Sequence, residues 1–138
     1  MNPIVLDASV FAKMFFEEAH SAQVRRIVSK ARELIAPDLI LAEVANVIWK
    51  RHARREVDDA EAAVVVREIL RFPIRLIPTT VLLSDAFSIA LDCQRSVYDS
   101  LYLAAAIQHH ATLITADRRF ARAIAATASA QFVHLIGE

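Results

Sequence analysis

Short apolar runs alternate with longer stretches of helical periodicity along the whole chain. Apolar runs bounded by polar residues or proline are typical of buried strands, and apolar residues spaced three and four apart are typical of helices. These patterns predict strands at 4–6, 34–36, 74–77, 113–115 and 132–136. They predict helices at 10–18, 22–33, 38–55, 58–70, 79–93, 96–111 and 118–126.

This alternation predicts an α/β fold, a three-layer sandwich with helices on both faces of a central parallel sheet of about four to five strands. The 138 residues suit a single domain spanning 1–138, and no linker or repeat interrupts them. Asp58 and Glu61 have the spacing of a capping box at a helix start. Thr79 or Thr80 is expected to cap the helix that follows.

The amino-acid composition excludes some classes of function. The hydrophobic fraction is 56%, which favours a full core, and the single glycine excludes Gly-rich phosphate loops. The net charge of zero does not point to nucleic-acid binding by itself, but metal bound to several acids would leave a net basic surface. Cys93 is alone, as expected in a reducing cytoplasm. No apolar run suggests a membrane span or a signal peptide.

Four acids lie within or directly after apolar segments: Asp7, Glu43, Asp99 and Asp117. Charged side chains are rarely buried unless they are paired or bind metal. Asp7 and Asp117 follow predicted strands, and parallel sheets bind ligands at the carboxyl ends of their strands. We therefore expect one acidic site for a divalent metal, preferably Mg²⁺ or Mn²⁺, as in many enzymes that cleave phosphodiesters.

Each acid alone has a structural alternative. Asp7 and Asp117 could cap the helices that follow them, Asp99 could form a capping box with Ser96, and Glu43 could be solvated at the edge of an apolar stripe. Two carboxylates about 4 Å apart repel by roughly 4 kcal/mol at an effective dielectric constant near 20. An Asp99→Asn substitution is therefore expected to keep the fold, abolish cleavage and raise metal-free stability.

Four segments, each holding one of these acids, carry a resemblance to a known family. They are residues 4–9 (IVLDAS), 41–47 (LAEVANV), 97–104 (VYDSLYLA) and 113–120 (LITADRRF). In this order and spacing the chain resembles, over essentially its whole length, the PIN-domain ribonucleases. Within them it is most similar to the VapC-like toxins of VapBC-type toxin–antitoxin pairs.

The resemblance implies a parallel sheet between helices and an endoribonuclease that requires Mg²⁺ or Mn²⁺. It implies that Asp7, Glu43, Asp99 and Asp117 bind the metal and are catalytic. Hydrolysis by metal-activated water would then give 5′-phosphate products. It also implies a homodimer and a small cognate antitoxin. One variant of the family carries a further acid just after the fourth acid. Here Phe120 follows instead, so a fifth acidic ligand is not expected.

Three polar residues could support the acids. Asn46 lies one turn after Glu43 and could orient Glu43 or the substrate, or could be an ordinary polar residue on a helix face. Ser9 and Thr115 each stand two residues from an acid. Their hydroxyls could hydrogen-bond a carboxylate. Alternatively, either residue could simply cap a helix or lie at the edge of a strand.

Several cations could bind an RNA backbone. Lys50 and Arg54 continue the helical stripe that holds Glu43, but cations at a helix C-terminus are also favoured by the dipole. Arg118 and Arg119 follow Asp117, where a solvated face is an equal explanation.

Other functions remain to be tested. A PIN-like protein could bind RNA or a partner without cleaving it. A signalling receiver domain would need paired acids at its first strand, and a haloacid-dehalogenase-like phosphatase would need Asp-x-Asp, whereas here Asp7 is followed by Ala8 and Ser9.

Overall fold

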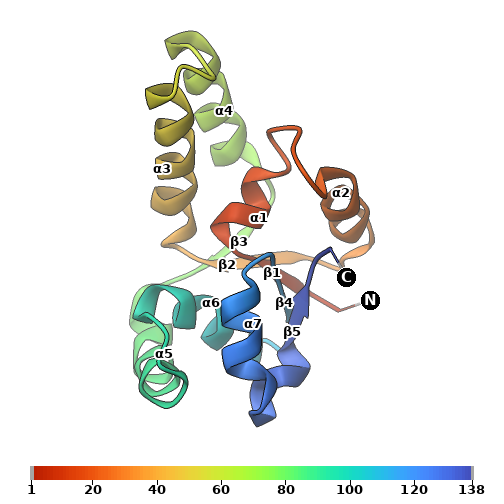
Figure 1. The fold of residues 1–138 in the computed structure, drawn as a ribbon, viewed down its shortest axis with the longest axis vertical. Helices are drawn as coiled ribbons and strands as arrows, with labels where there is room; N and C mark the ends of the chain where they lie inside the picture. Colours follow the sequence, from red (N-terminus) through yellow and green to blue (C-terminus); the bar gives the residue numbers. More distant parts are fainter. Residues whose placement is uncertain (1, 138) are drawn as a thin grey trace.

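A five-stranded parallel sheet forms the centre of the computed structural model, which describes residues 2–137 (Figure 1). The strands are β1 (Ile4–Leu6), β2 (Leu34–Pro37), β3 (Arg75–Ile77), β4 (Thr112–Thr115) and β5 (Val133–Leu135). Their order in the sheet is β3-β2-β1-β4-β5, and every neighbouring pair is parallel. The predicted parallel sheet is confirmed.

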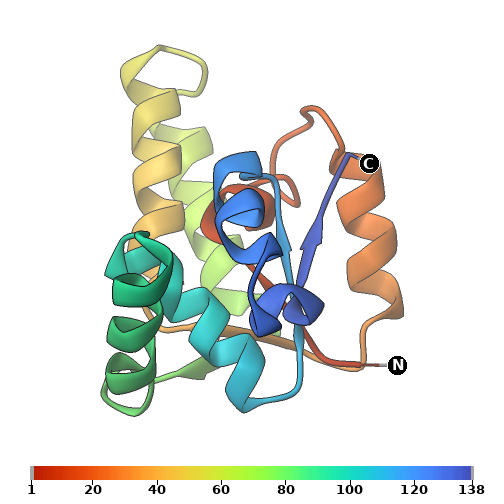
Figure 2. The same cartoon turned by 60° about the horizontal axis from the view of Figure 1, so that its bottom comes forward.

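Helices cover both faces of this sheet, as predicted. They are α1 (Ala8–Ala12), α2 (Ser21–Lys30), α3 (Ile40–Ala53), α4 (Asp59–Arg71), α5 (Thr79–Cys93), α6 (Val97–Gln108) and α7 (Arg118–Ala125), followed by the 3₁₀ helix η1 (Ala128–Phe132). Figure 1 shows α1 to α4 on one side of the sheet and α5 to α7 on the other. In both views α3 and α4 form a hairpin that extends beyond the sheet (Figure 2).

The strand order defines where a ligand can bind. The chain runs outward through β1, β2 and β3, returns through α5 and α6, and continues from β4 to β5 in the opposite direction. The switch in direction lies between β1 and β4, and crevices at such points are the usual binding sites of open α/β sheets. The order also differs from the flavodoxin-like 2-1-3-4-5 order of receiver domains. The receiver alternative is therefore wrong.

Helix α6 forms the centre of the core. All residues from Ser100 to Ala106 are buried, and α6 contacts β1, β2, β4 and α5. The helix begins at Val97 after its N-cap Ser96, whose hydroxyl accepts the Asp99 backbone N–H at 3.1 Å. A buried helix body thus fixes its first turn, which carries Asp99, at the switch point.

Two local predictions were wrong. The helix expected at 10–18 ends at Ala12, and the residues after it form turns. The apolar spacing there reflects aromatic packing, since the Phe15 ring lies edge-on to Phe11 with centroids 5.1 Å apart. Pro78, not a threonine, is the N-cap of α5, because the Thr79 hydroxyl instead donates to Asp38 at 2.8 Å.

The capping box at the start of α4 is confirmed, with both of its hydrogen bonds present. Most other elements match their predicted positions within a few residues. Among residues 2–137, no helix is long and apolar enough to cross a membrane.

Candidate active site

The four acids lie around one open cavity of about 380 Å³ at the switch point of the sheet. Asp7 follows β1, Asp117 follows β4, and Glu43 and Asp99 lie in the first turns of α3 and α6. The remaining wall is formed by smaller and polar residues: Ala8, Ser9, Ala42, Asn46, Val47, Lys50 and Tyr102. Acids separated by up to 110 positions in the sequence thus converge on one space.

Asp7 is held by three hydrogen bonds. Its Oδ1 accepts the Val10 backbone N–H and the Ser9 hydroxyl, both at 2.9 Å, and its Oδ2 accepts the Thr115 hydroxyl at 2.7 Å. Burial raises the pKa of Asp7 above its ordinary value, and the charge of Asp117 adds to this increase. The three hydrogen bonds act in the opposite direction but do not cancel the effect of burial. The charged form of Asp7 is therefore destabilised relative to its protonated form.

Thr115 connects the two acids that follow strands. Its side chain is buried, and its hydroxyl donates to Asp7 while accepting the Asp117 backbone N–H at 3.0 Å. Asp117 Oδ1 in turn accepts the Phe120 backbone N–H at 3.0 Å and caps α7. One hydroxyl thereby sets the relative position of two carboxylates.

Asp7 and Asp117 are therefore helix caps as well as walls of the cavity, and the two interpretations do not exclude each other. A carboxylate oxygen has two lone pairs, so an oxygen that accepts one hydrogen bond can still bind a cation. Asp99 satisfies half of the expected capping box, in which the Ser96 hydroxyl accepts its backbone N–H.

Tyr102 orients Glu43, and sequence reasoning missed it. The buried Tyr102 hydroxyl donates to Glu43 Oε1 at 2.6 Å. Burial and the neighbouring Glu43 carboxylate raise the pKa of Tyr102 well above its ordinary value, so the phenol stays protonated. Its position three residues after Asp99, on the same helix face, is the sequence signal that could have identified it.

Arg95 is the second missed residue. Its Nη2 lies 3.4 Å from Asp99 Oδ2 and 3.4 Å from Asp117 Oδ2, so one guanidinium bridges two of the acids. Its Nε is buried and has no hydrogen-bond partner among residues 2–137. The spacing of four residues between Arg95 and Asp99 was the available signal.

The donor set fits a hydrated magnesium or manganese ion. Carboxylate oxygens are the ligands that these ions prefer, and the bridging guanidinium of Arg95 shows that a cation is stabilised between Asp99 and Asp117. In the present arrangement of residues 2–137, no three acidic, histidine or cysteine side chains enclose a metal position. Mg²⁺ keeps several waters and needs only one or two direct carboxylates.

The remaining predicted residues divide into two groups. Ser9, Asn46 and Lys50 line the cavity. Arg54, the exposed C-cap residue of α3, ion-pairs with Glu56 at 3.7 Å and does not contribute to the wall.

Arg118 and Arg119 begin α7 directly after Asp117 and are exposed, outside the set of cavity-lining residues.

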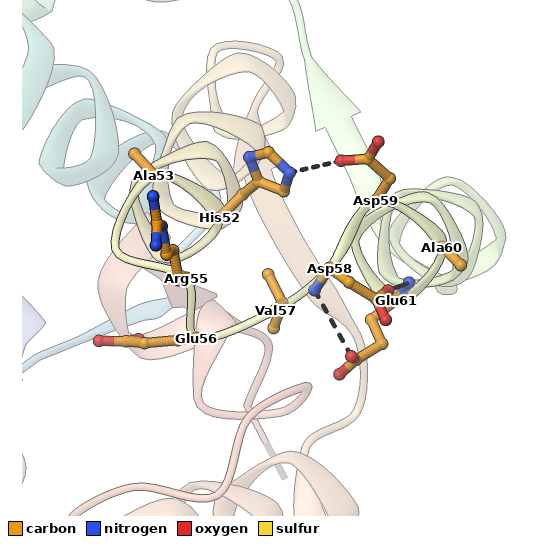
Figure 3. Close-up of a pocket in the computed structure, with 9 residues that line it drawn as sticks. All are labelled: His52, Ala53, Arg55, Glu56, Val57, Asp58, Asp59, Ala60 and Glu61. Atoms are coloured by element: carbon orange, nitrogen blue, oxygen red, sulfur yellow. Dashed lines mark hydrogen bonds and ion pairs between the residues drawn. The ribbon is translucent and has the colours of Figure 1, made fainter.

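A larger hollow of about 740 Å³ lies at the turn between α3 and α4 and contains none of the four acids (Figure 3). Its polar groups serve the turn itself. Asp58 Oδ1 accepts the Glu61 backbone N–H at 2.8 Å, which lowers the pKa of Asp58, and His52 contacts Asp59 at 2.5 Å. The acid-lined cavity is the better candidate for chemistry, because four carboxylates from distant parts of the chain converge there at the switch point of the sheet.

A parallel sheet with these four acids around one cavity is the arrangement that the resemblance to the PIN-domain family implies. The sequence profile of the PIN domain matches residues 4–125, most of the chain. The chain therefore belongs to the PIN-domain family.

Within that family the chain is similar to ribonuclease VapC3 of Pyrobaculum aerophilum. The two are 37% identical over 120 residues, which cover 86% of this chain and 92% of the relative. The predicted resemblance to VapC proteins is confirmed.

Two solved structures share the fold. VapC20 of Mycobacterium tuberculosis, described as a sarcin–ricin loop cleaving toxin, superposes with a TM-score of 0.66 at 19% identity, over 87% of this chain and 94% of that one. A toxin–antitoxin complex from Klebsiella pneumoniae gives a TM-score of 0.62 at 14% identity, over 95% of each chain.

Proposed function

We propose that this protein is an endoribonuclease dependent on Mg²⁺ or Mn²⁺, and that it is the toxin of a type II toxin–antitoxin pair. The observation that carries the proposal is the convergence of four carboxylates on one open cavity at the switch point of the sheet. The identity of 37% to a protein named as a ribonuclease supports RNA as the substrate.

Asp7, Glu43, Asp99 and Asp117 would hold the metal. When bound, the ion supplies positive charge that stabilises a phosphodiester under attack and lowers the pKa of water. The chain's own contribution is orientation. Thr115 and Ser9 hold the Asp7 carboxylate, and Tyr102 holds that of Glu43, so the chain itself sets the orientation of these two acids.

The rim of the cavity supplies groups for an RNA backbone. Asn46 and Lys50 follow Glu43 on α3 by one and two turns, and both line the cavity. Lys50 would contact a phosphate, while Asn46 would hydrogen-bond the substrate or Glu43. Arg118 and Arg119 would contact phosphates outside the cavity, and Arg54 would have to release its ion pair with Glu56 to do the same.

We also propose a small antitoxin and a second copy of this chain as partners, acting in the cytoplasm. The similar fold in the Klebsiella pneumoniae toxin–antitoxin complex supports the first partner, as does an apolar hollow of about 480 Å³ whose walls include Phe15, Phe16 and Val64. The exposed apolar stripe Leu83, Phe87 and Leu91 on α5 supports the second, since such stripes are typical of interfaces.

The test is cleavage of total RNA by purified, antitoxin-free protein in Mg²⁺, in Mn²⁺ and in EDTA. Asp99→Asn is compared with Asp92→Asn, which makes the same change at an exposed position near the end of α5. We expect discrete fragments that require metal, persist with Asp92→Asn and disappear with Asp99→Asn. Circular dichroism confirms that both variants fold.

The alternative is a PIN-like protein that binds RNA or a partner without cleaving it. No fragments from folded wild type with either metal, or the same fragments in EDTA, would overturn the proposal and favour this alternative. Retained binding of RNA in a filter assay would then identify the binding role.

A further inference from the structure

Arg95 forms ion pairs with two of the four acids that line the cavity. Its Nη2 lies 3.4 Å from an oxygen of Asp99 and 3.4 Å from an oxygen of Asp117. The Arg95 side chain is 24% exposed and each carboxylate side chain is 42% exposed, so the pairs are partly shielded from water. We propose that Arg95 is a built-in counter-cation that competes with the divalent metal for Asp99 and Asp117.

The backbone fixes where Arg95 can act. Helix α5 ends at Cys93, and its C-cap Gln94 has a left-handed backbone with φ of 55°. Ser96 then caps α6, so Arg95 lies alone between two capping residues of helices that pack against each other. Its side chain therefore starts from a rigid position beside the cavity.

The guanidinium is held there incompletely. Its Nε is buried without a partner among residues 2–137, and both of its ion pairs use the same nitrogen, Nη2. Arginine binds a carboxylate most strongly through two parallel N–H···O bonds, which neither pair makes. A ligand that binds the two carboxylates better can therefore displace it.

A metal ion needs the same oxygens. Divalent ions bind carboxylate oxygens at roughly 2.0–2.6 Å and carry twice the charge of a guanidinium. The two cations would repel each other if both stayed, so metal binding and the Arg95 bridge exclude each other. Whatever stabilises the metal-free state lowers the apparent affinity for metal. Arg95 thus neutralises two acids when no metal is bound and sets the metal concentration at which binding occurs.

This inference rests on the proposed metal-dependent function, so its test measures binding and not cleavage. Mn²⁺ is titrated by calorimetry into metal-free wild type, Arg95→Gln, Arg95→Lys and Arg75→Gln. Arg75 is the matched control, because its guanidinium ion-pairs with Glu33 at 3.2 Å at the beginning of β3, the end of the sheet opposite to the acids.

We expect Arg95→Gln to bind Mn²⁺ about three- to tenfold more tightly, the effect of removing two partly exposed ion pairs. Arg95→Lys, which keeps the charge but loses the planar fork, should fall between Arg95→Gln and wild type. Arg75→Gln should match wild type. In thermal unfolding, Arg95→Gln should lower the midpoint in EDTA and gain more from Mn²⁺ than wild type gains.

The outcomes separate this inference from the proposed function. If wild type binds Mn²⁺, Asp7→Asn abolishes that binding, and Arg95→Gln binds no more tightly, the competition is refuted while the metal site stands. If neither wild type nor Arg95→Gln binds Mn²⁺, both are refuted. Should Arg95→Gln fail to fold, an unchanged dissociation constant for Arg95→Lys refutes the competition by itself.

Discussion

Replacing Thr115 by valine tests how the two strand-end acids are positioned. Valine has nearly the same shape but no hydroxyl, so the substitution removes the hydrogen bond to Asp7 at 2.7 Å and the acceptor of the Asp117 N–H at 3.0 Å. A hydrogen bond to a charged group contributes about 1.5–3 kcal/mol, and an unpaired buried donor costs about 1–3 kcal/mol.

Because Asp117 is only half-buried, water can reach part of the unpaired N–H. We therefore expect the free energy of unfolding to fall by about 2–4 kcal/mol in the metal-free protein at pH 7. The hydrogen bond from Thr115 lowers the pKa of Asp7, so its loss should raise that pKa further. The destabilisation should accordingly be largest where Asp7 is charged and should shrink as the pH falls through the raised pKa.

The assay is urea unfolding in EDTA, followed by circular dichroism at several pH values. Thr115→Ser keeps the hydroxyl and should retain most of the stability, apart from the loss of one methyl group. Thr112→Val makes the same chemical change at the beginning of β4, away from the acids. If Thr115→Val were no less stable than Thr112→Val, or if its deficit did not depend on pH, the bridging role of the hydroxyl would be refuted.

Three further substitutions have defined outcomes. Burial raises the folded-state pKa of Asp7, so its ionisation reduces stability above that pKa. Asp7→Asn should therefore raise the metal-free melting temperature at pH 7, with a gain that fades toward the ordinary Asp pKa near about 4; no gain in EDTA would contradict this. Tyr102→Phe should cost about 1–3 kcal/mol in urea unfolding and couple with Glu43→Gln in a double-mutant cycle, whereas additive effects would exclude a direct interaction. Lys50→Gln should reduce the slope of log K against log salt for single-stranded RNA by about 0.7, and Arg54→Gln by less; equal slopes would remove Lys50 from the interface.

The acids were predictable because each is locally conspicuous. Asp7 and Asp117 terminate strands, so their convergence followed from the binding of ligands at the carboxyl ends of parallel strands, whereas Glu43 and Asp99 were noticed because they interrupt apolar helices. The strand order was not predictable, because the alternation of strands and helices does not specify which strands are neighbours. The turn after Ala12 was missed because the aromatic spacing of Phe11 and Phe15 looks helical.

The side chains that contact the acids were harder to predict from the sequence. Arg95 and Tyr102 reach partners on other elements, Asp117 and Glu43, and that reach depends on how α6 packs against the sheet. This changes one expectation. Asp99 already has a cation beside it, so Asp99→Asn is no longer expected to stabilise the metal-free protein. The substitution that stabilises the metal-free protein should instead be Asp7→Asn, because burial raises the pKa of Asp7.

The caps formed by Asp7 and Asp117 have an evolutionary consequence. Each residue begins a helix, and losing such a cap costs about 0.5–2 kcal/mol whether or not the protein cleaves anything. Purifying selection for foldability alone should preserve a side chain that can cap, aspartate or asparagine, at both positions in a descendant that has lost its activity. Glu43 caps no helix, so in such a lineage only the hydrogen bond from Tyr102 opposes its loss. In relatives of this protein, joint loss of the Glu43 carboxylate and of its partner hydroxyl on Tyr102, beside intact caps at both strand ends, would therefore mark a site that has lost its function.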